Sequence, residues 1–346
     1  MSKLLSIIIP CNNVVGKFHI VEGLRTIDSP DVEIIFIEDN STDDTAALIE
    51  KEATTLNADW QMERGRFGGP GPARDRGVAL SSGKYLWFVD ADDLMMPQAI
   101  IANLTEFRER DHDYYAFGIV KFVKSKNNAL TAEKAWHMPT TDAQSLFERM
   151  QPLWMCNIIF RRDFLDRYGI GFLPHVYVQV DFYMIVQVLV HAKTYRIIDT
   201  YGYEYLHHAN SLSHEPIRPR SLSKWISTIR ILEFVETHAP EEYATFDIAA
   251  QKIGLVYDWS RYIESGQYRE LIEAFPYIVA TLRQHGLERH IATFLNTGSL
   301  PNRILRRCAY WYARAKAIFN DYDLDSLKRY YLEKERANAA SPIARR

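Results

Sequence analysis

The sequence predicts an α/β protein in which a layered sheet is followed by a helical region. Short apolar runs alternate with helical patterns over residues 4–97. This alternation is typical of a doubly wound, mainly parallel sheet with helices on its faces. From Arg220 onward the pattern changes to long helical segments. We therefore expect a sheet domain over residues 1–214 and a helical C-terminal region over residues 215–346.

Each expected strand is a short apolar run. The predicted strands cover residues 4–9, 32–39, 84–89, 113–123, 157–160 and 194–199, with a further short strand near Trp60. The helices between them are expected over residues 42–56, 71–82, 97–108 and 180–192, after a first helical stretch that ends near Thr26. The later helices are expected over residues 222–236, 243–265 and 268–286 and in the basic tail. Residues 124–141 are polar and weakly patterned, so we predict no element there.

The composition excludes several classes of protein. A net charge of −3 and a pI near 6.4 give no electrostatic reason to expect a nucleic-acid partner. The apolar runs are far shorter than the roughly 18 residues of a membrane span, and the N-terminal "MSKLLSIIIPC" resembles a first strand more than a signal peptide. Cys11, Cys156 and Cys308 lack any CxxC spacing, which argues against a disulfide framework and a zinc site. A reducing cytoplasm is the expected location.

Three carboxylates follow a buried-looking strand in "KYLWFVDADDLMMP", residues 84–97. Asp90, Asp92 and Asp93 should repel one another unless a positive charge lies between them. In doubly wound sheets, ligands bind beyond the carboxyl ends of the strands, and a few oxygen ligands there suit Mg²⁺ or Mn²⁺ shared with a phosphate. The alternative is that one of them caps the helix that begins near Pro97. The similar pair Asp111 and Asp113 is expected to be solvated.

Two more features are predicted to reach the same edge. Asp39 ends the second strand, ahead of the helix cap that Ser41 or Thr42 could supply, and it could accept hydrogen bonds from a nucleobase or a ribose. The loop "GGPGPARDRG" lacks the Lys-Ser/Thr ending of a nucleotide P-loop and the order of a dinucleotide motif. It is instead expected to bring Arg74 to a diphosphate, whereas Arg76 could simply pair with a surface acid.

Four segments together resemble a known family. "SIIIPCNN", "EIIFIEDNSTDDT", "GPARDRGVALSSGKYLWFVDADDLMMP" and "VDFYMIVQVLVHAKTYRIIDTYGYEYLHHANS" occur in the order and spacing of family 2 glycosyltransferases of the GT-A fold. The resemblance covers about residues 3–213 and leaves the helical C-terminus uncovered. The third segment is the most specific, because its Arg-x-x-Gly, Gly-Lys-Tyr, Asp-x-Asp-Asp and Pro features match together. The implied fold is a Rossmann-like, nucleotide-binding mixed sheet flanked by helices.

The resemblance implies a site for a nucleotide-sugar donor and a divalent metal. Pro10 and Asp39 would hold the base, and Arg74 and Asp90 would lie near the ribose and the sugar diphosphate. Asp92, with Asp90, would bind Mn²⁺ or Mg²⁺. The full set of implied donor-binding residues is Pro10, Asn12, Asp39, Arg74, Asp90 and Asp92. The family usually has tyrosine where this chain has Asn12, so base stacking must come from elsewhere.

Asp181 occupies the position of the family's catalytic base. In an inverting transfer, one carboxylate deprotonates the acceptor hydroxyl on the face opposite the leaving diphosphate. The family's Glu-Asp pair is Val180-Asp181 here, which removes a neighbour that could tune the base. The alternative is that Asp181 only caps the following helix.

Weaker expectations concern residues around the site. A late histidine sometimes completes the metal shell in GT-A enzymes, and His208 in "YLHHANSLSH" is a candidate; an ordinary polar contact is the alternative. Asp93 and Trp154 are candidates for the acceptor side, although Trp154 could equally pack in the core.

The C-terminal tail contains a basic amphipathic helix. Residues 301–346 hold eleven Lys and Arg against five Asp and Glu. Such a helix suits an anionic membrane surface, although its apolar side could instead pack on the preceding helices. The phase of the helix places Arg303, Arg306, Arg307 and Arg314 on one side and Leu305, Cys308, Tyr312 and Phe319 on the other.

The predicted function is that of a metal-dependent, inverting hexosyl- or N-acetylhexosaminyltransferase. It would move a sugar from a UDP-sugar to a hydroxyl of a glycan or glycolipid in bacterial capsule, lipopolysaccharide or other surface-polysaccharide synthesis. We expect it in the cytoplasm, either free or bound peripherally to the inner face of the cell membrane. Two alternatives stay open: a catalytically silent nucleotide-sugar-binding subunit and a sugar-phosphate nucleotidylyltransferase. Nucleotidylyltransferases normally have a glycine-rich signature with a lysine near the N-terminus, and the stretch "PCNNVVGK" of this chain does not match it. The sequence predicts no oligomeric state.

Overall fold

The computed structural model describes most of the chain as two compact units. The described residues are 3–124, 130–136, 153–207, 219–242, 266, 268–286, 288, 291–296, 299–320 and 322–340. The first unit comprises Met1–Pro174 and Met184–Ser211, and the second comprises His175–Tyr183 and Leu212–Arg346. The short segment His175–Tyr183 thus belongs to the second unit although the chain on both sides of it belongs to the first. The expected boundary at residue 214 stays a prediction.

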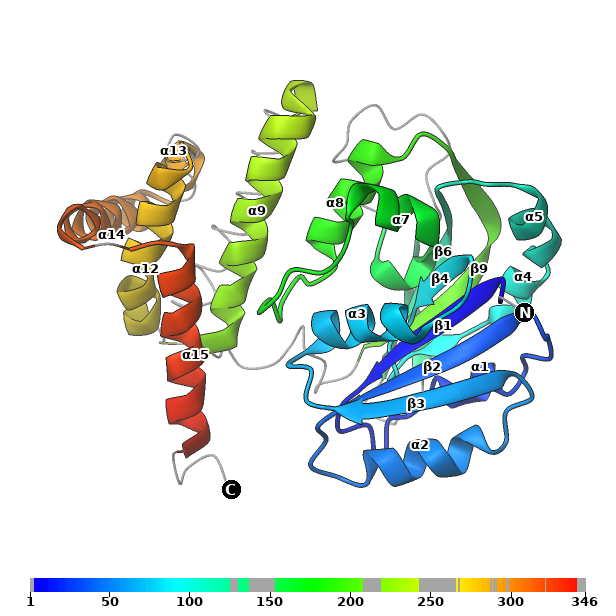
Figure 1. Cartoon of the computed structure of the whole chain (residues 1–346). Helices are drawn as coiled ribbons and strands as arrows, with labels where there is room; N and C mark the ends of the chain where they lie inside the picture. The colour runs from blue at the N-terminus through cyan, green and yellow to red at the C-terminus, as the bar shows by residue number, and fades with distance from the viewer. Residues whose placement is uncertain are drawn as a thin grey trace. The chain divides into compact units, whose positions relative to one another are not determined.

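The first unit contains the predicted mixed sheet (Figure 1). Its strand order is β3-β2-β1-β4-β8-β6-β9-β5, with β7 paired to β6. The first four strands are mutually parallel, whereas β8 runs antiparallel to both β4 and β6. The strands are β1 (Leu5–Cys11), β2 (Val32–Asp39), β3 (Asp59–Gly65), β4 (Tyr85–Phe88), β5 (Leu94–Met95), β6 (Tyr114–Lys124), β7 (Leu130–Trp136), β8 (Ile158–Arg161) and β9 (Tyr195–His207).

Helices cover both faces of the parallel half of the sheet. Ile7 and Ile9 of β1 share a core cluster with Ile49 of the helix α2, while Ile8 faces Gly77 of the helix α3. A strand covered on both faces reads as an unbroken apolar run, which is why β1 has the sequence "LSIIIPC". The helices of this unit are α1 (Val21–Leu24), α2 (Thr45–Ala53), α3 (Pro70–Leu80), α4 (Pro97–Ile101), α5 (Leu104–Glu109), α7 (Arg162–Tyr168) and, from Met184 onward, α8 (Phe182–His191).

Three predictions about local elements were wrong. The single helix expected over residues 97–108 is two short helices, α4 and α5. The strand expected over residues 194–199 continues to His207 because β9 pairs along β6 as far as Val123. The strand β7 lies in a stretch where no element was expected. Its sequence "LTAEKAW" is too polar to indicate a strand, but it pairs with β6. In each case pairing or packing with distant residues overrode the local pattern.

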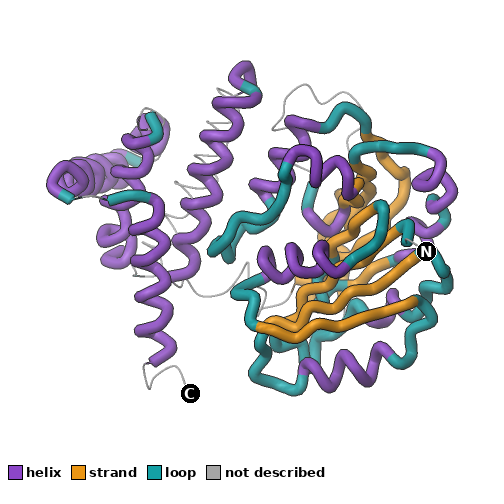
Figure 2. The backbone as a smooth tube through the Cα atoms, viewed as in Figure 1, coloured by secondary structure: helices purple, strands orange, loops and turns teal. Residues whose placement is uncertain are grey.

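The second unit is helical in the part that the structure describes (Figure 2). The helix α12 packs against α14 and α15, and α15 also contacts the short helix before α9. None of the described helices is long and apolar enough to cross a membrane. The helix expected over residues 243–265 lies outside the described residues. The helices are η3 (Pro219–Leu222), α9 (Ser223–His238), α12 (Tyr268–Gln284), α13 (Ile291–Asn296), α14 (Leu300–Phe319) and α15 (Leu324–Ala340).

The predicted division of the basic tail helix into two sides was wrong. Arg306 of α14 is only 2% exposed, and burial lowers the pKa of its guanidinium. Leu305 and Tyr312 from the expected apolar side are exposed instead. The buried stripe runs through Ala309 and Ala313, because small side chains let α14 approach its neighbours closely. The outer surface of α14 is therefore both apolar and basic.

Candidate active site

The carboxyl ends of β1, β2 and β4 lie at one edge of the sheet because these strands are parallel. Asp39 ends β2 there. Its carboxylate accepts hydrogen bonds from the backbone N–H groups of Phe67, Gly68 and Gly69, at 2.6, 3.1 and 2.7 Å. A carboxylate has roughly four acceptor positions, so about one remains for a bound molecule. Asp39 thus shapes the glycine-rich loop in front of α3.

The loop after β1 is tied to the loop after β2. Asn12 donates to the carbonyl of Asp39 at 2.7 Å, and Asn13, at a φ of 52°, donates its backbone N–H to Ser41 Oγ at 3.0 Å. The Asn13 side chain accepts from Thr42. The expectation that Ser41 or Thr42 caps α2 was therefore wrong, since both are used to join these loops.

Pro10 lies at the point where β1 has already left β4. The pairing between these two strands ends at Ile8 and Phe88, while Pro10 still pairs with Ile37 of β2. Its missing N–H therefore costs no hydrogen bond to β4. The side chain is half-buried, and base binding by Pro10 and Asn12 stays a prediction.

Arg74 reaches Asp90 from the middle of α3. Its Nη2 lies 2.5 Å from Asp90 Oδ1, and the Arg74 side chain is 8% exposed against 44% for Asp90. The guanidinium also lies 5.7 Å from the centre of the Phe172 ring, and its Nε is buried without a hydrogen-bond partner. Gly77 allows α3 to pack closely on β1, because an added Cβ would overlap the Ile8 side chain. Arg74 and Asp90 thus meet at one edge of the sheet, and their contact with a nucleotide sugar stays a prediction.

Asp93 turns inward toward β9. It is 2% exposed, and it accepts hydrogen bonds from Tyr203 Oη at 2.6 Å and from the Leu206 N–H at 2.8 Å. Tyr203 Oη in turn accepts from the Asp90 N–H at 3.0 Å. Burial, with the nearby carboxylates of Asp90 and Asp92, raises the pKa of Asp93 well above its usual range. Contact of Asp93 with an acceptor stays a prediction.

Sequence reasoning missed Tyr203, which fixes the acidic loop, residues 90–93 after β4, to β9. Its pKa is raised well above the ordinary value, mainly by burial and then by Asp93. The only available signal was its place in the aromatic run "YGYEYL", which is equally typical of core packing. The residues that it bonds are 110 and 113 positions away, so no local pattern indicates the contact.

The acidic loop concentrates negative charge at the end of β4. Burial, followed by Glu38, Asp92 and Asp90, raises the pKa of the Cys11 thiol at the end of β1. The alternative that one of these aspartates caps α4 was wrong, because Met96 holds the cap position and no side chain bonds there.

The acidic loop fits a metal that is shared with a substrate. Asp92 is half-buried and Asp90 is 44% exposed, and Mg²⁺ commonly binds through one or two carboxylates together with substrate phosphates. Within the described ranges, no group of three or more His, Cys, Asp and Glu side chains is arranged to hold a metal by itself. Metal binding by Asp90 and Asp92 is therefore a proposal that depends on a phosphate ligand.

Asp75, next to Arg74, is a titrating carboxyl close to the site. Partial burial raises its pKa to about 6, against the lowering effects of the Phe172 N–H and of Arg74. Its neighbour Arg76 pairs with Glu63 at 2.8 Å, so the alternative of a surface ion pair is confirmed for Arg76.

The second aspartate pair was expected to be solvated, and this is wrong for Asp113. It is 6% exposed, it pairs with Arg161 at 2.6 Å, and it accepts from the N–H groups of Lys193 and Thr194. Asp111 is exposed and pairs with Lys84. Asp113 therefore joins β8 to the start of β9 and is structural.

Asp181 lies in the segment His175–Tyr183 of the second unit. It is half-buried and directly precedes α8, which begins at Phe182. The structure thus leaves open both readings of Asp181, a helix cap and a catalytic base.

The remaining predicted site residues are less informative. Trp154 is half-buried, packs against the core cluster, and lies 6.4 Å from the Tyr205 ring. Its contact with an acceptor stays a prediction. His208 lies outside the described residues, so its proposed metal ligation has no structural account.

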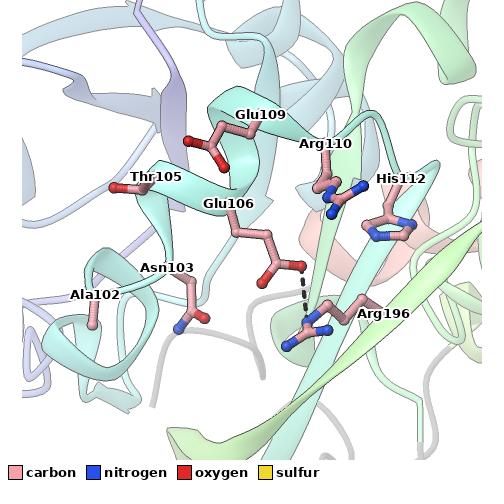
Figure 3. A pocket seen from close by; sticks show the side chains of 8 residues that line it. All are labelled: Ala102, Asn103, Thr105, Glu106, Glu109, Arg110, His112 and Arg196. Carbon is pink, nitrogen blue, oxygen red and sulfur yellow. Dashed lines mark ion pairs between the residues drawn. The ribbon is translucent and has the colours of Figure 1, made fainter.

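A cavity of about 560 Å³ lies away from this edge (Figure 3). It is lined by α5 and by the start of β9, and Glu106 pairs with Arg196 inside it at 2.8 Å (Figure 3). Arg196 pairs with Tyr115 near the beginning of β6, and His112 just before β6 also lines the cavity. The starts of β6 and β9 lie at the end of the sheet opposite to the carboxyl ends that carry Asp39 and Asp90. The cavity is therefore not part of the candidate active site.

Comparison with known families gives a match in the sheet unit. Residues 6–169 match the family model described as glycosyl transferase family 2. Over these residues the chain is similar to family 2 glycosyltransferases. The match contains Asp39, Arg74, Asp90 and Asp92, and it ends before Asp181.

Several curated proteins and solved structures are similar to the chain. Glycosyltransferase GlyG of Streptococcus pneumoniae is 26% identical over 130 residues, covering 37% of this chain and 43% of GlyG. The UDP-Glc:alpha-D-GlcNAc-diphosphoundecaprenol beta-1,3-glucosyltransferase WfaP of Escherichia coli is 26% identical over 218 residues, covering 61% of this chain and 80% of WfaP. The chain spans less than two thirds of GlyG and of the uncharacterized glycosyltransferases EpsJ and YibD.

The similarity to solved structures extends over nearly the whole chain. The crystal structure of S. aureus TarS 1-349 in complex with UDP has a TM-score of 0.62 at 19% identity, and the match covers 97% of this chain and 92% of that one. A complex of the same protein with UDP-GlcNAc gives the same TM-score and coverage. This confirms the predicted GT-A fold with its helical C-terminal region.

Proposed function

We propose that this protein transfers a sugar from a UDP-sugar to a hydroxyl group of a surface glycan or a lipid-linked glycan. The observation that carries the proposal is the buried Arg74, which meets Asp90 at the same sheet edge as Asp39, within the residues that are similar to family 2 glycosyltransferases. The relatives support the substrate classes: WfaP is named for UDP-Glc and a diphosphoundecaprenol-linked acceptor, and TarS has been crystallised with UDP-GlcNAc.

The edge formed by the carboxyl ends of β1, β2 and β4, which we call the donor edge, would bind the nucleotide and the diphosphate. The nucleobase would lie against the glycine-rich loop whose N–H groups donate to Asp39. Pro10 and Asn12 would contact the base from the loop after β1. Arg74 meets Asp90 at this edge, and a guanidinium binds phosphate oxygens well in two-pronged geometry. Its burial and its contact with Phe172 fix the orientation of the charge before the donor binds, which lowers the entropic cost of binding.

A divalent cation bound with the diphosphate would neutralise charge on the leaving group. Asp92 and Asp90 would hold it, and Mn²⁺ or Mg²⁺ suits such oxygen ligands. Tyr203 and Asp93 fix the backbone of this loop, so the two carboxylates keep their positions at the strand end.

Asp181 would act as the base that takes the proton from the acceptor hydroxyl. The bond from the sugar to the diphosphate breaks as the acceptor oxygen attacks from the opposite face, and the configuration at the sugar carbon is inverted. The base must lie within hydrogen-bond reach of that hydroxyl. This assignment rests on the position of Asp181 in the sequence.

A panel of UDP-sugars with and without Mn²⁺ tests the proposed activity. Release of UDP from one or a few donors, dependent on metal and accelerated by an acceptor glycan, is the expected result. A protein that binds UDP but releases none from any donor with metal and acceptor present would instead be the silent binding subunit. Formation of UDP-sugar and diphosphate from UTP and a sugar phosphate would identify a nucleotidylyltransferase.

The exposed side of α14 is suited to an anionic membrane surface. Ile304, Trp311 and Ile318 follow one another at seven-residue spacing, so they share one helix face, and they are 55%, 60% and 60% exposed. Arg314 lies 5.2 Å from the Trp311 ring, and the exposed Lys316 lies beside Tyr312. Aromatic and basic side chains on one surface are typical of helices that lie in the membrane interface. Peripheral binding would bring the protein to a lipid-linked acceptor.

Sedimentation with vesicles tests membrane binding. The variant Ile304→Ser/Trp311→Ser should sediment less than the wild type with vesicles that contain phosphatidylglycerol. Both proteins should sediment less with neutral vesicles than with these anionic vesicles. The control is Trp60→Ser, which removes another exposed tryptophan from the edge strand β3. Equal sedimentation of the α14 variant and the wild type would remove the membrane proposal.

A further inference from the structure

We infer that the C-terminal helices α9 and α15 position the proposed catalytic base. This inference rests on the proposed function. The segment His175–Tyr183, which carries Asp181, groups with the helical second unit. The helices beyond residue 219 thus have a role in the chemistry, as the support of the segment that bears Asp181.

Three hydrogen bonds fix the backbone of this segment. The Tyr177 N–H donates to Ser223 Oγ at 3.0 Å, and Ser227 Oγ donates to the Gln179 carbonyl at 3.3 Å. The Tyr331 hydroxyl donates to the carbonyl of His175. Ser223 and Ser227 are one turn apart on α9, so they face the segment together. All three helix side chains that make these bonds are fully buried, which shields the bonds from competing water.

The bonds hold a backbone shape that the segment would rarely adopt alone. His175 and Gln179 have φ angles of 60° and 57°, a region that non-glycine residues seldom occupy. The only other non-glycine residues with positive φ in the described part of the chain are Asn13 and Asn40, in the loops at the donor edge. Such conformations persist where surrounding contacts impose them, and they concentrate at functional sites. The two carbonyls that α9 and α15 bind belong to these two residues.

Side-chain contacts reinforce the same support. The Tyr177 and Tyr331 rings meet edge to face with centres 6.5 Å apart, and Tyr183 meets Phe234 of α9 at 6.1 Å. Val180 is 8% exposed. A carboxylate in its place would lose most of its hydration, which gives a physical reason for valine where the family resemblance leads one to expect glutamate.

The positions of the contacts define the role. Gln179 is two residues before Asp181, and the segment between the His175 bond and α8 is short. Release of either carbonyl would let the backbone relax out of the left-handed region and displace the Asp181 carboxylate. Tyr331 and Ser227 are therefore positioning residues, which act on the acceptor proton only through Asp181.

Steady-state kinetics of Tyr331→Phe test the inference, because this change removes only the hydroxyl and keeps the ring contact. A displacement of about 1 Å at a reacting group can lower the rate about 100-fold. We expect kcat for transfer to fall by roughly 10- to 100-fold, with KM for the UDP-sugar and the affinity for UDP within about twofold of the wild type. The matched control is Tyr330→Phe, which removes the hydroxyl that donates to Glu273 from the preceding position of α15. It should transfer at the wild-type rate.

A second variant and a second measurement keep the test decisive. Ser227→Ala frees the Gln179 carbonyl from α9 and should lower kcat in the same way, whether or not Tyr331→Phe folds well. Hydrogen exchange of the amides in residues 175–183 should become faster in both variants, with α12 unchanged. Wild-type kcat in both variants, or equal losses in Tyr330→Phe, would overturn the inference. Absence of transfer by the wild-type chain would count against the proposed function itself and would remove the positioning role with it.

Discussion

The donor edge of the sheet and the segment around Asp181 are built in different ways. At the donor edge, Asp39 ends β2 and Asp90 follows β4, the two strands that flank β1, and Arg74 comes from α3, which lies between them in sequence. The segment His175–Tyr183 depends on residues up to 156 positions away, such as Tyr331. The first region follows from strand order, whereas the second exists only when the helical unit has folded.

This difference predicts separate effects for variants at the donor edge and variants in α9 or α15. A change at the donor edge should alter the binding of nucleotide and metal and leave the segment around Asp181 in place. A change in α9 or α15 should alter the rate of transfer and leave nucleotide binding intact. Each of the following variants either separates the two regions further or shows that they are not independent.

Asp92→Asn should have the largest effect among the donor-edge variants. Loss of the proposed metal ligand removes charge stabilisation of the leaving diphosphate, so transfer should fall by about 1000-fold. Titration of activity with Mn²⁺ would measure it, and the variant should need much more metal than the wild type. The control is Asp111→Asn, which alters an exposed aspartate that pairs with Lys84. Wild-type activity and metal dependence in Asp92→Asn would remove Asp92 from the metal site.

Asp93→Ala should destabilise the sheet unit. It leaves the Tyr203 hydroxyl and the Leu206 N–H buried without their acceptor, which should cost about 2–3 kcal/mol of unfolding free energy. Asp93→Asn keeps an acceptor and should cost much less. Denaturant unfolding at pH 7 compares the two. Equal stability of both variants would mean that these hydrogen bonds do not hold the acidic loop to β9.

Arg74→Lys should weaken UDP binding by about tenfold, because lysine is a point charge without the planar fork of arginine. Calorimetric titration with UDP and Mn²⁺ would measure the affinity. Arg76→Lys is the matched control on the same helix, since Arg76 pairs with Glu63 outside the site. Equal affinities for the two variants would contradict the proposed diphosphate contact.

Asp75→Asn should have the smallest effect and a distinct pH dependence. The pKa of Asp75 is raised to about 6 in the folded protein, so the unfolded chain loses this proton first as the pH rises from about 4. The wild type therefore loses stability between about pH 4 and pH 6, and the asparagine variant should not. Because the side chain is partly exposed, the gain at pH 7 should be no more than about 1 kcal/mol. Melting temperatures at pH 4 and pH 7 would reveal a gain only at the higher pH.

The shared edge of Asp39 and Asp90 could be predicted because the sequence pattern behind it is local. Each apolar run ends in a polar residue, and parallel strands bring their ends to one edge, so Asp39 and Asp90 could be placed without a structure. The approach of Arg74 follows from the helix between these strands, and Gly77 is the visible sign of its close packing.

The remaining features depend on contacts that no local pattern reveals. Tyr203 is one aromatic residue among several in β9, and only the fold shows that it bonds both Asp90 and Asp93. Arg306 looked like a solvated member of a basic face, yet packing of α14 buries it. Ser227 and Tyr331 lie in helices with ordinary amphipathic patterns, so their contacts with His175 and Gln179 could not be predicted.

The most direct test of the central claim is the behaviour of Asp181→Asn. The claim is that the donor edge binds the nucleotide independently, while Asp181 supplies the base for transfer. The predicted result is UDP affinity within about twofold of the wild type together with a loss of transfer of at least about 1000-fold. Transfer at the wild-type rate, or loss of UDP binding in the folded variant, would contradict it.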